Sequence, residues 1–84
     1  MEYGLYAIKD ARSAFMPPVP ERSDAVAKRN FSHAVLARDS IFRDFPNDFS
    51  FYRVGSFDDQ SGEVVHCQPA FLIDAAEILS AQKE

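Results

Sequence analysis

Apolar residues at the start of the chain are too closely spaced for a strand with one solvent face. Residues 3–9 read Tyr-Gly-Leu-Tyr-Ala-Ile-Lys, a pattern typical of a strand at the centre of a sheet and covered on both faces. A turn at residues 10–13 and the apolar residues 14–16 predict a short second strand. The prolines at 17, 18 and 20 then predict an extended connection, because each fixes φ and removes a backbone donor.

The next segment has the spacing of an amphipathic helix. Ser23 is a favourable N-cap, and Asp24 follows in the first turn, where a negative charge suits the helix dipole. The apolar stripe falls at i, i+4, i+7 and i+8, on Ala27, Phe31, Ala34 and Val35. We expect this helix to fray by residues 37–39. Residues 39–40 then cap a brief helical turn, and residues 45–48 form a turn before the next strand.

Residues 49–57 (Phe-Ser-Phe-Tyr-Arg-Val-Gly-Ser-Phe) predict a strand of unusually high β-propensity. Simple alternation places residues 49, 51, 53, 55 and 57 on one face. Gly55 inside this run indicates a bulge or the close approach of another backbone. The polar residues 58–62 and the apolar residues after them predict a hairpin, with Gly62 at a positive φ.

The last element predicted is a helix that begins near Pro69, which suits a first helical position. Its apolar residues are Phe71, Leu72, Ala75, Ile78 and Leu79, at i, i+1, i+4, i+7 and i+8. The order is therefore β(β)-α-β-β-α. We predict a single α+β domain over residues 1–84, a small antiparallel sheet with two main helices on one face.

Charge is distributed unevenly along the 84 residues. The net charge is −4, but residues 1–57 carry eight basic and seven acidic residues, a net of +1, whereas residues 58–84 carry one basic and six acidic residues, a net of −5. An acidic protein is a poor default candidate for binding nucleic acid, because most of that affinity comes from neutralising phosphates. A local basic surface has to be argued from position.

Arg53 among aromatic residues has two interpretations. With Phe51 and Tyr52 it could stack on bases, as in proteins that bind single strands. Alternatively, it lies on a core strand and pairs with an acid such as Asp58 or Glu63. The RNA-recognition-motif signature is missing, because the required basic-Gly-aromatic order is absent.

Four other basic residues could contact phosphate. Lys28 and Arg29 lie on the polar side of the first predicted helix, and Lys9 and Arg12 lie at the first predicted turn. A solvated helix face and turn explain the same residues without any ligand. The sequence alone is compatible with both interpretations.

Residues suited to metal binding or catalysis do not form a motif. Residues 58–63 (Asp-Asp-Gln-Ser-Gly-Glu) lack the ligand spacing of a calcium loop. His66 and Cys67 are neighbours on a predicted strand and point to opposite faces, and neither zinc binding nor a Cys–His nucleophile pair is indicated. We therefore predict a non-enzymatic protein with no metal and no cofactor.

Several short segments together resemble a known family. These are F-x-x-Y-R-V-G-S-F-D-D-Q-S-G, preceded by S-D-A-V-A-x-R and F-P-N-D-F and followed by P-x-F-L-I-D-A. The chain resembles the small non-structural protein of gokushovirus-type Microviridae, which are single-stranded DNA phages of bacteria. The resemblance implies an accessory protein of viral genome replication. It assigns no catalytic or binding residue.

The leading hypothesis is a replication-associated phage protein, a homodimer in the cytoplasm of the bacterial host, that contacts single-stranded DNA or the replication complex. Its candidate residues are Arg53, Phe51 and Tyr52 for stacking and Lys9, Arg12, Lys28 and Arg29 for phosphate. The rival is a protein–protein interaction module that binds a host or viral protein through its acidic C-terminal third. No membrane-spanning run and no signal peptide is expected, and the single cysteine, Cys67, fits a reducing compartment.

Overall fold

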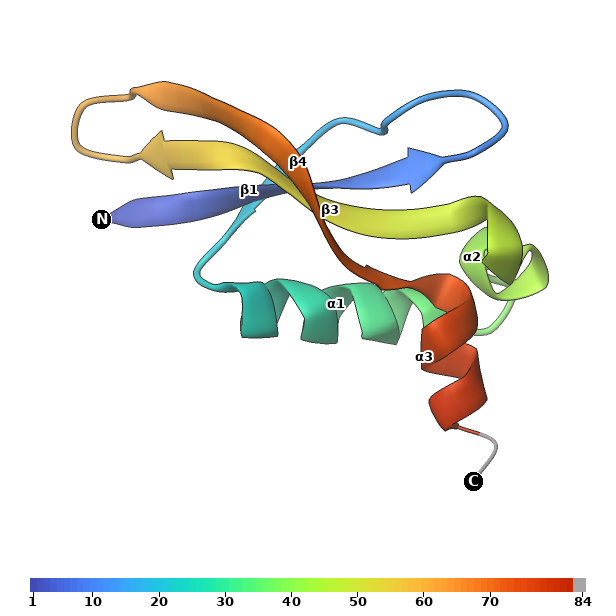
Figure 1. Ribbon diagram of the computed structural model, residues 1–84. Helices are drawn as coiled ribbons and strands as arrows, with labels where there is room; N and C mark the ends of the chain where they lie inside the picture. Colours follow the sequence, from blue (N-terminus) through green and yellow to red (C-terminus); the bar gives the residue numbers. More distant parts are fainter. Residues whose placement is uncertain (83–84) are drawn as a thin grey trace.

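A computed structural model describes residues 1–82 and contains a four-stranded antiparallel sheet with helices, which confirms the predicted α+β class (Figure 1). The strand order is β2-β1-β3-β4. Strand β1 lies inside the sheet, as its continuous apolar pattern predicted. The predicted cover on both faces is wrong for the described residues, because their helices lie on one side of the sheet only. The strands are β1 (Glu2–Asp10), β2 (Val19–Glu21), β3 (Phe49–Asp58) and β4 (Val64–Asp74).

The helices lie on one side of the sheet (Figure 1). They are α1 (Asp24–Leu36), the short α2 (Ile41–Asp44), the 3-10 turn η1 (Pro46–Asp48) and α3 (Ala75–Ala81). Ser23 caps α1 as predicted, because its hydroxyl accepts the backbone N–H of Val26 at 3.2 Å. Ser40 caps α2 in a similar way through the N–H of Phe42.

A small hydrophobic core fills the space between sheet and helices. Phe31 of α1 stacks on Phe51 of β3 with ring centroids 4.7 Å apart and ring planes only 5° from parallel. The buried residues of the core come from both layers: Tyr6, Ala27, Phe31, Val35, Phe49, Phe51, Ala75 and Ile78. The predicted helical stripe is thus the buried side of α1.

A bulge in β3 changes which residues share a face. Arg53 pairs with Tyr6 of β1, but the next pair joins Gly55 to Leu5, so Val54 is an extra residue. Gly55 also lies so close to β4 that a Cβ would collide with the carbonyl oxygen of Val65. Both roles predicted for Gly55 are confirmed. Simple alternation fails beyond the bulge, because the extra residue moves Gly55 and Phe57 to the face opposite Phe51 and Arg53.

The second strand is displaced from its predicted position. Residues 14–16 form a loop with one isolated bridge between Phe15 and Lys9, and the strand is β2, at Val19–Glu21. Pro17 and Pro18 have no N–H to donate to a ladder. Regular pairing with β1 therefore resumes only after them, at Val19 opposite Tyr6.

The prediction of a helix from Pro69 is wrong for its first turns. Residues 69–74 continue β4, and α3 begins at Ala75. Pairing with β3 outweighs the helical spacing, since Phe71 lies opposite Tyr52 and Ile73 opposite Phe51. Asp74 is the N-cap, and its carboxylate accepts the N–H of Glu77 at 2.7 Å.

The predicted hairpin turn between β3 and β4 is confirmed, because Gly62 has a φ of +76°.

Candidate nucleic-acid interface

Arg53 lies on the helix side of the sheet, where it meets the start of α1. Its Nη1 is 3.4 Å from Oδ1 of Asp24, and its guanidinium carbon is 5.9 Å from the ring centroid of Tyr6. The acid that pairs with Arg53 is therefore Asp24, rather than the predicted Asp58 or Glu63. The sequence offered no signal for this partner, because the two residues are 29 positions apart in the sequence.

Tyr6 completes a small polar group beneath α1. Its hydroxyl donates a 2.6 Å hydrogen bond to the same Oδ1 of Asp24. Burial of the phenol, followed by this bond to a carboxylate, raises the pKa of Tyr6 to about 12. Tyr6 is thus a neutral donor at physiological pH, and the group joins β1, β3 and α1.

The two aromatic candidates beside Arg53 lie on opposite faces. Phe51 is buried between Phe31 and Tyr6, whose ring centroids are 4.7 Å and 5.8 Å from its own. Its ring faces are therefore covered in this fold and cannot receive a base. Tyr52 points the other way, to the sheet face that carries no helix, which we call the open face.

An aromatic cluster of Phe15, Tyr52 and Phe71 lies on the open face. Tyr52 meets the other two rings edge to face, with centroid distances of 5.4 Å to Phe15 and 5.8 Å to Phe71. Phe15 is 42% exposed and Phe71 is 53% exposed. Each therefore presents apolar ring surface to solvent, which is what stacking on a base requires.

The sequence pattern does not identify Phe15 and Phe71 as candidates. Helical spacing places Phe71 on the apolar side of a helix that does not form at that position. The signal that could have found it is Asp74 followed by Glu77, a capping pattern that places the helix start after Phe71. For Phe15 no local signal exists, because its position depends on the bridge to Lys9.

The four basic candidates are divided between the two sides of the sheet. Lys9 is on the open face, with its Nζ 5.6 Å from the ring centroid of Phe15. Arg12 lies in the turn after β1, where its Nε is 3.6 Å from a carboxylate oxygen of Asp48. Lys28 and Arg29 belong to α1, on the helix side. The seven predicted residues therefore do not form one site.

Acidic groups limit the open face at one end. A hollow of about 240 Å³ adjoins Tyr52 and Phe71, and its lining includes Asp48 and Asp74. Asp48 is partly neutralised by Arg12, and Asp74 is engaged as the N-cap of α3. Any polyanion on this face would therefore approach from the Lys9 and Phe15 side.

Residues 3–78 match the model of the Phage ORF5 protein family. The chain belongs to this family. The expected assignment to a family of phage proteins is thereby confirmed. No curated protein and no solved structure matches the chain.

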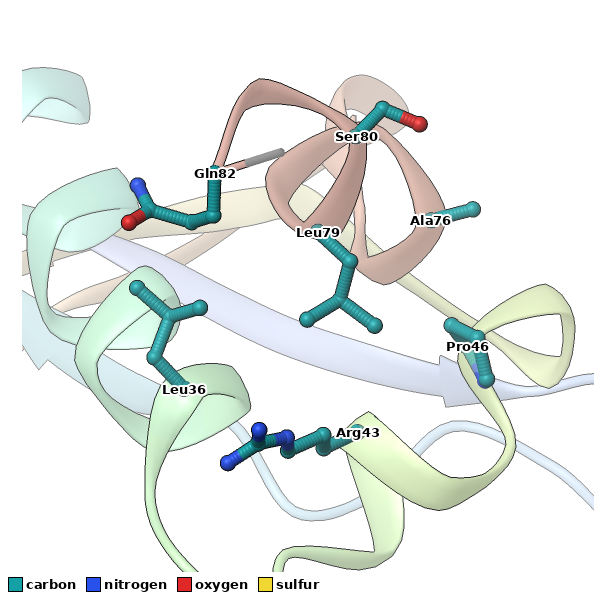
Figure 2. Close-up of a pocket in the computed structure, with 7 residues that line it drawn as sticks. All are labelled: Leu36, Arg43, Pro46, Ala76, Leu79, Ser80 and Gln82. Carbon is teal, nitrogen blue, oxygen red and sulfur yellow. The ribbon is translucent and has the colours of Figure 1, made fainter. Parts of the chain in front are cut away.

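A groove of this ORF5 family member lies between its helices. It measures about 700 Å³ and is lined by Leu36, Arg43, Pro46, Ala76, Leu79, Ser80 and Gln82. Figure 2 shows Leu79 reaching from α3 into the space between Leu36, Arg43 and Pro46, whereas Ser80 points away. Among the described residues, Arg43 is the charged side chain that lines the groove, and Leu36, Pro46, Ala76 and Leu79 make its apolar surroundings.

Across residues 1–82, the His, Cys, Asp and Glu side chains form no group of three or more that could hold a metal ion. None of the helices in that same range is long and apolar enough to cross a membrane.

Proposed function

We propose that this phage protein is a non-enzymatic accessory of viral genome replication that contacts single-stranded DNA through the open face of its sheet. The observation that carries the proposal is the aromatic cluster of Phe15, Tyr52 and Phe71, in which the Phe15 and Phe71 rings are exposed. The resemblance to gokushovirus-type Microviridae supports single-stranded DNA as the ligand and the cytoplasm of the bacterial host as the location. Viral or host replication proteins are the other partners that this role implies.

Base stacking and phosphate contacts would both contribute to the binding free energy, but the phosphate contacts make the affinity depend on salt. A base stacked on an aromatic side chain is worth about 1–3 kcal/mol, with little dependence on sequence. Lys9, and Arg12 if it exchanges Asp48 for a phosphate, are the cations near this face. Each contact with a single strand contributes a log–log salt slope of about −0.7, so two contacts give about −1.4. Binding would therefore depend on salt only weakly compared with a basic DNA-coating protein.

The rival function uses the acidic C-terminal third as a docking surface. Within residues 58–82, its acidic residues fall at the two ends of β4. Asp58, Asp59 and Glu63 lie near the hairpin turn, and Asp74 and Glu77 lie at the start of α3. Asp59 is also engaged by the chain's own terminal amine at 2.6 Å. Because the charges are divided in this way, we prefer the open face as the binding surface.

The test is fluorescence anisotropy of a labelled single-stranded oligonucleotide at two salt concentrations. We expect Phe71→Ala and Tyr52→Ala each to weaken binding roughly tenfold, the loss of one stacked base. Phe45→Ala is the matched aromatic control, because Phe45 is 57% exposed at the end of α2 and lies outside the cluster. Equal effects of Phe71→Ala and Phe45→Ala, or no salt-sensitive binding at micromolar protein, would reject the proposal.

Charge substitutions divide the candidate residues by face. Lys9→Ala is expected to weaken binding and to reduce the salt slope, whereas Lys28→Ala is its control on the helix side. Arg53→Ala is expected to leave DNA affinity unchanged, since Arg53 faces α1. A large loss of affinity in Arg53→Ala, with folding intact, would move the binding surface to the helix side.

A further inference from the structure

The two edges of the sheet are built very differently. At one edge, β2 has only three residues, contains Pro20 and follows two more prolines. A very short edge strand offers another chain few backbone groups to pair with, and each proline removes one N–H donor. At the other edge, β4 has eleven residues. Only the β4 edge therefore offers a long strand for pairing.

The β4 edge also lacks the charges that usually protect such a strand. Residues 64–73 (Val-Val-His-Cys-Gln-Pro-Ala-Phe-Leu-Ile) contain no Lys, Arg, Asp or Glu. Val64 is 64% exposed, Val65 is 49% exposed and Phe71 is 53% exposed. Natural proteins commonly place lysine on an open edge, and a long uncharged edge is a site of strand addition.

We infer that β4 pairs antiparallel with β4 of a second copy of this chain about a two-fold axis. A two-fold interface brings the same surface of both subunits together, so it must be self-complementary. An uncharged strip meets this condition in a chain whose net charge is −4, because identical copies meet there without repulsion between acids. A strongly charged peptide would find no opposite charge along residues 64–73.

The faces of β4 restrict the possible registers, and we place the two-fold axis in one that they allow. Val64 pairs with Phe57 on the open face, where Phe71 also lies, whereas Val65 and Ala70 pair with Ser56 and Arg53 on the helix side. Residues directly opposite in an antiparallel pair share a face. Placing Val64 opposite Phe71 and Val65 opposite Ala70 satisfies this for both pairs, and the axis then passes between residues 67 and 68.

The centre of β4 is irregular, and the proposed pairing accommodates it. The ladder with β3 is interrupted between Ala70 and His66, where Pro69 contributes no N–H. Residues 64–65 and 70–71 flank this interruption, and in the proposed register each short segment pairs with the other segment of the second copy. The hydrogen bonds of the interface therefore come from the two regular segments.

Such a dimer has a consequence for the open face. The sheets of both copies become continuous, and the cluster around Phe71 of one subunit adjoins Val64 of the other. A longer apolar surface then runs across the two-fold axis. The dimer itself does not depend on DNA, so it stands or fails separately from the proposed function.

The first test measures mass in solution without DNA, by light scattering during size-exclusion chromatography. We expect twice the chain mass of 9.5 kDa. Val65→Lys places a charge at the interface and should raise the dimer dissociation constant at least tenfold, about 1.4 kcal/mol. Ile41→Lys is the control, because Ile41 is 55% exposed on α2. A monomer at about 100 µM, or equal behaviour of both variants, would overturn the inference.

The second test examines the register. In a Cys67→Ser background, the pair Val65→Cys and Ala70→Cys should form disulfides between subunits and give a covalent dimer on a non-reducing gel. The two positions are too far apart along one extended strand to react within a chain. Pairing Val65→Cys with Ile41→Cys is the control. A stable dimer that fails to crosslink at 65 and 70 would reject the β4 interface.

Discussion

The guanidinium of Arg53 on β3 lies 3.4 Å from the carboxylate of Asp24 in the first turn of α1, and the same oxygen accepts the Tyr6 hydroxyl at 2.6 Å. One carboxylate thus joins two strands to the helix that covers them. The Arg53 and Asp24 side chains are 36% and 48% exposed, whereas Tyr6 is fully buried. Solvent screens the ion pair, so the bond to Tyr6 carries more of the stability.

Substitutions of Asp24 and Arg53 should therefore lower the free energy of unfolding by different amounts. Asp24→Ala leaves a buried hydroxyl without its acceptor, and we expect it to lower the free energy of unfolding by about 1–3 kcal/mol. Arg53→Ala removes only a screened pair, and about 0–1 kcal/mol is expected. Asp24→Asn keeps an acceptor and should lie between them. Urea titration measures all three, and a larger loss in Arg53→Ala than in Asp24→Ala would contradict this ranking.

The raised pKa of Tyr6 predicts a loss of stability at alkaline pH. The folded protein holds this proton up to a pKa of about 12, against an ordinary value of 10.0. Between these values the unfolded chain releases the proton first, so stability is complete below pH 10 and declines as the pH rises toward 12. A difference of two pKa units corresponds to at most about 2.7 kcal/mol.

The variant Tyr6→Phe isolates this effect. Because phenylalanine has no proton to release, its stability should fall less steeply than that of the wild type between pH 10 and pH 12. Urea unfolding at several pH values gives both curves. Parallel curves for the two proteins would show that Tyr6 does not titrate differently in the folded state.

Gly55 should tolerate substitution worse than Gly62. A Cβ at Gly55 would collide with the Val65 carbonyl oxygen, which is backbone and can move only by disturbing the β3–β4 ladder. We expect Gly55→Ala to cost about 1–3 kcal/mol, as for overpacking in a core. Gly62 has open space but a φ of +76°, so Gly62→Ala should cost about 1 kcal/mol. Thermal or urea unfolding compares the two.

A milder substitution separates the two causes. Asn tolerates a positive φ better than Ala does, so Gly62→Asn should recover part of the stability lost in Gly62→Ala. Gly55→Asn should recover nothing, because its Cβ meets the same oxygen. Recovery at Gly55 would refute the steric explanation.

Local signals predicted much of this fold. The Ser23 cap and the stripe of Ala27, Phe31 and Val35 depend only on neighbours within a few turns, and α1 forms where they indicate. The turn at Gly62 is equally local. The end of β4 is not, because Phe71 has helical spacing toward Ala75 and joins a strand only through its pairing with Tyr52.

The candidate site was less predictable, because it depends on which face of the sheet each side chain of β3 occupies. One extra residue, Val54, reverses the alternation of β3, so a count from Phe51 through Phe57 gives the wrong side. The partners of Tyr52 come from residues 15 and 71, far apart in the sequence. The sequence indicated an aromatic strand, but only the assembled sheet distinguishes Tyr52, which is half-buried in the cluster on the open face, from the buried Phe51.

The different burial of Phe51 and Phe71 predicts that Phe51→Ala destabilises the fold much more than Phe71→Ala does. Phe51 is 4% exposed and stacks on Phe31, so its removal leaves a cavity and should cost about 3–5 kcal/mol. Phe71 is 53% exposed, so its truncation should cost about 1 kcal/mol or less when measured on monomeric protein. Urea unfolding in the Val65→Lys background removes any contribution from the proposed dimer. If Phe71→Ala destabilised the monomer as much as Phe51→Ala, the ring would belong to the core and could not serve as a stacking surface.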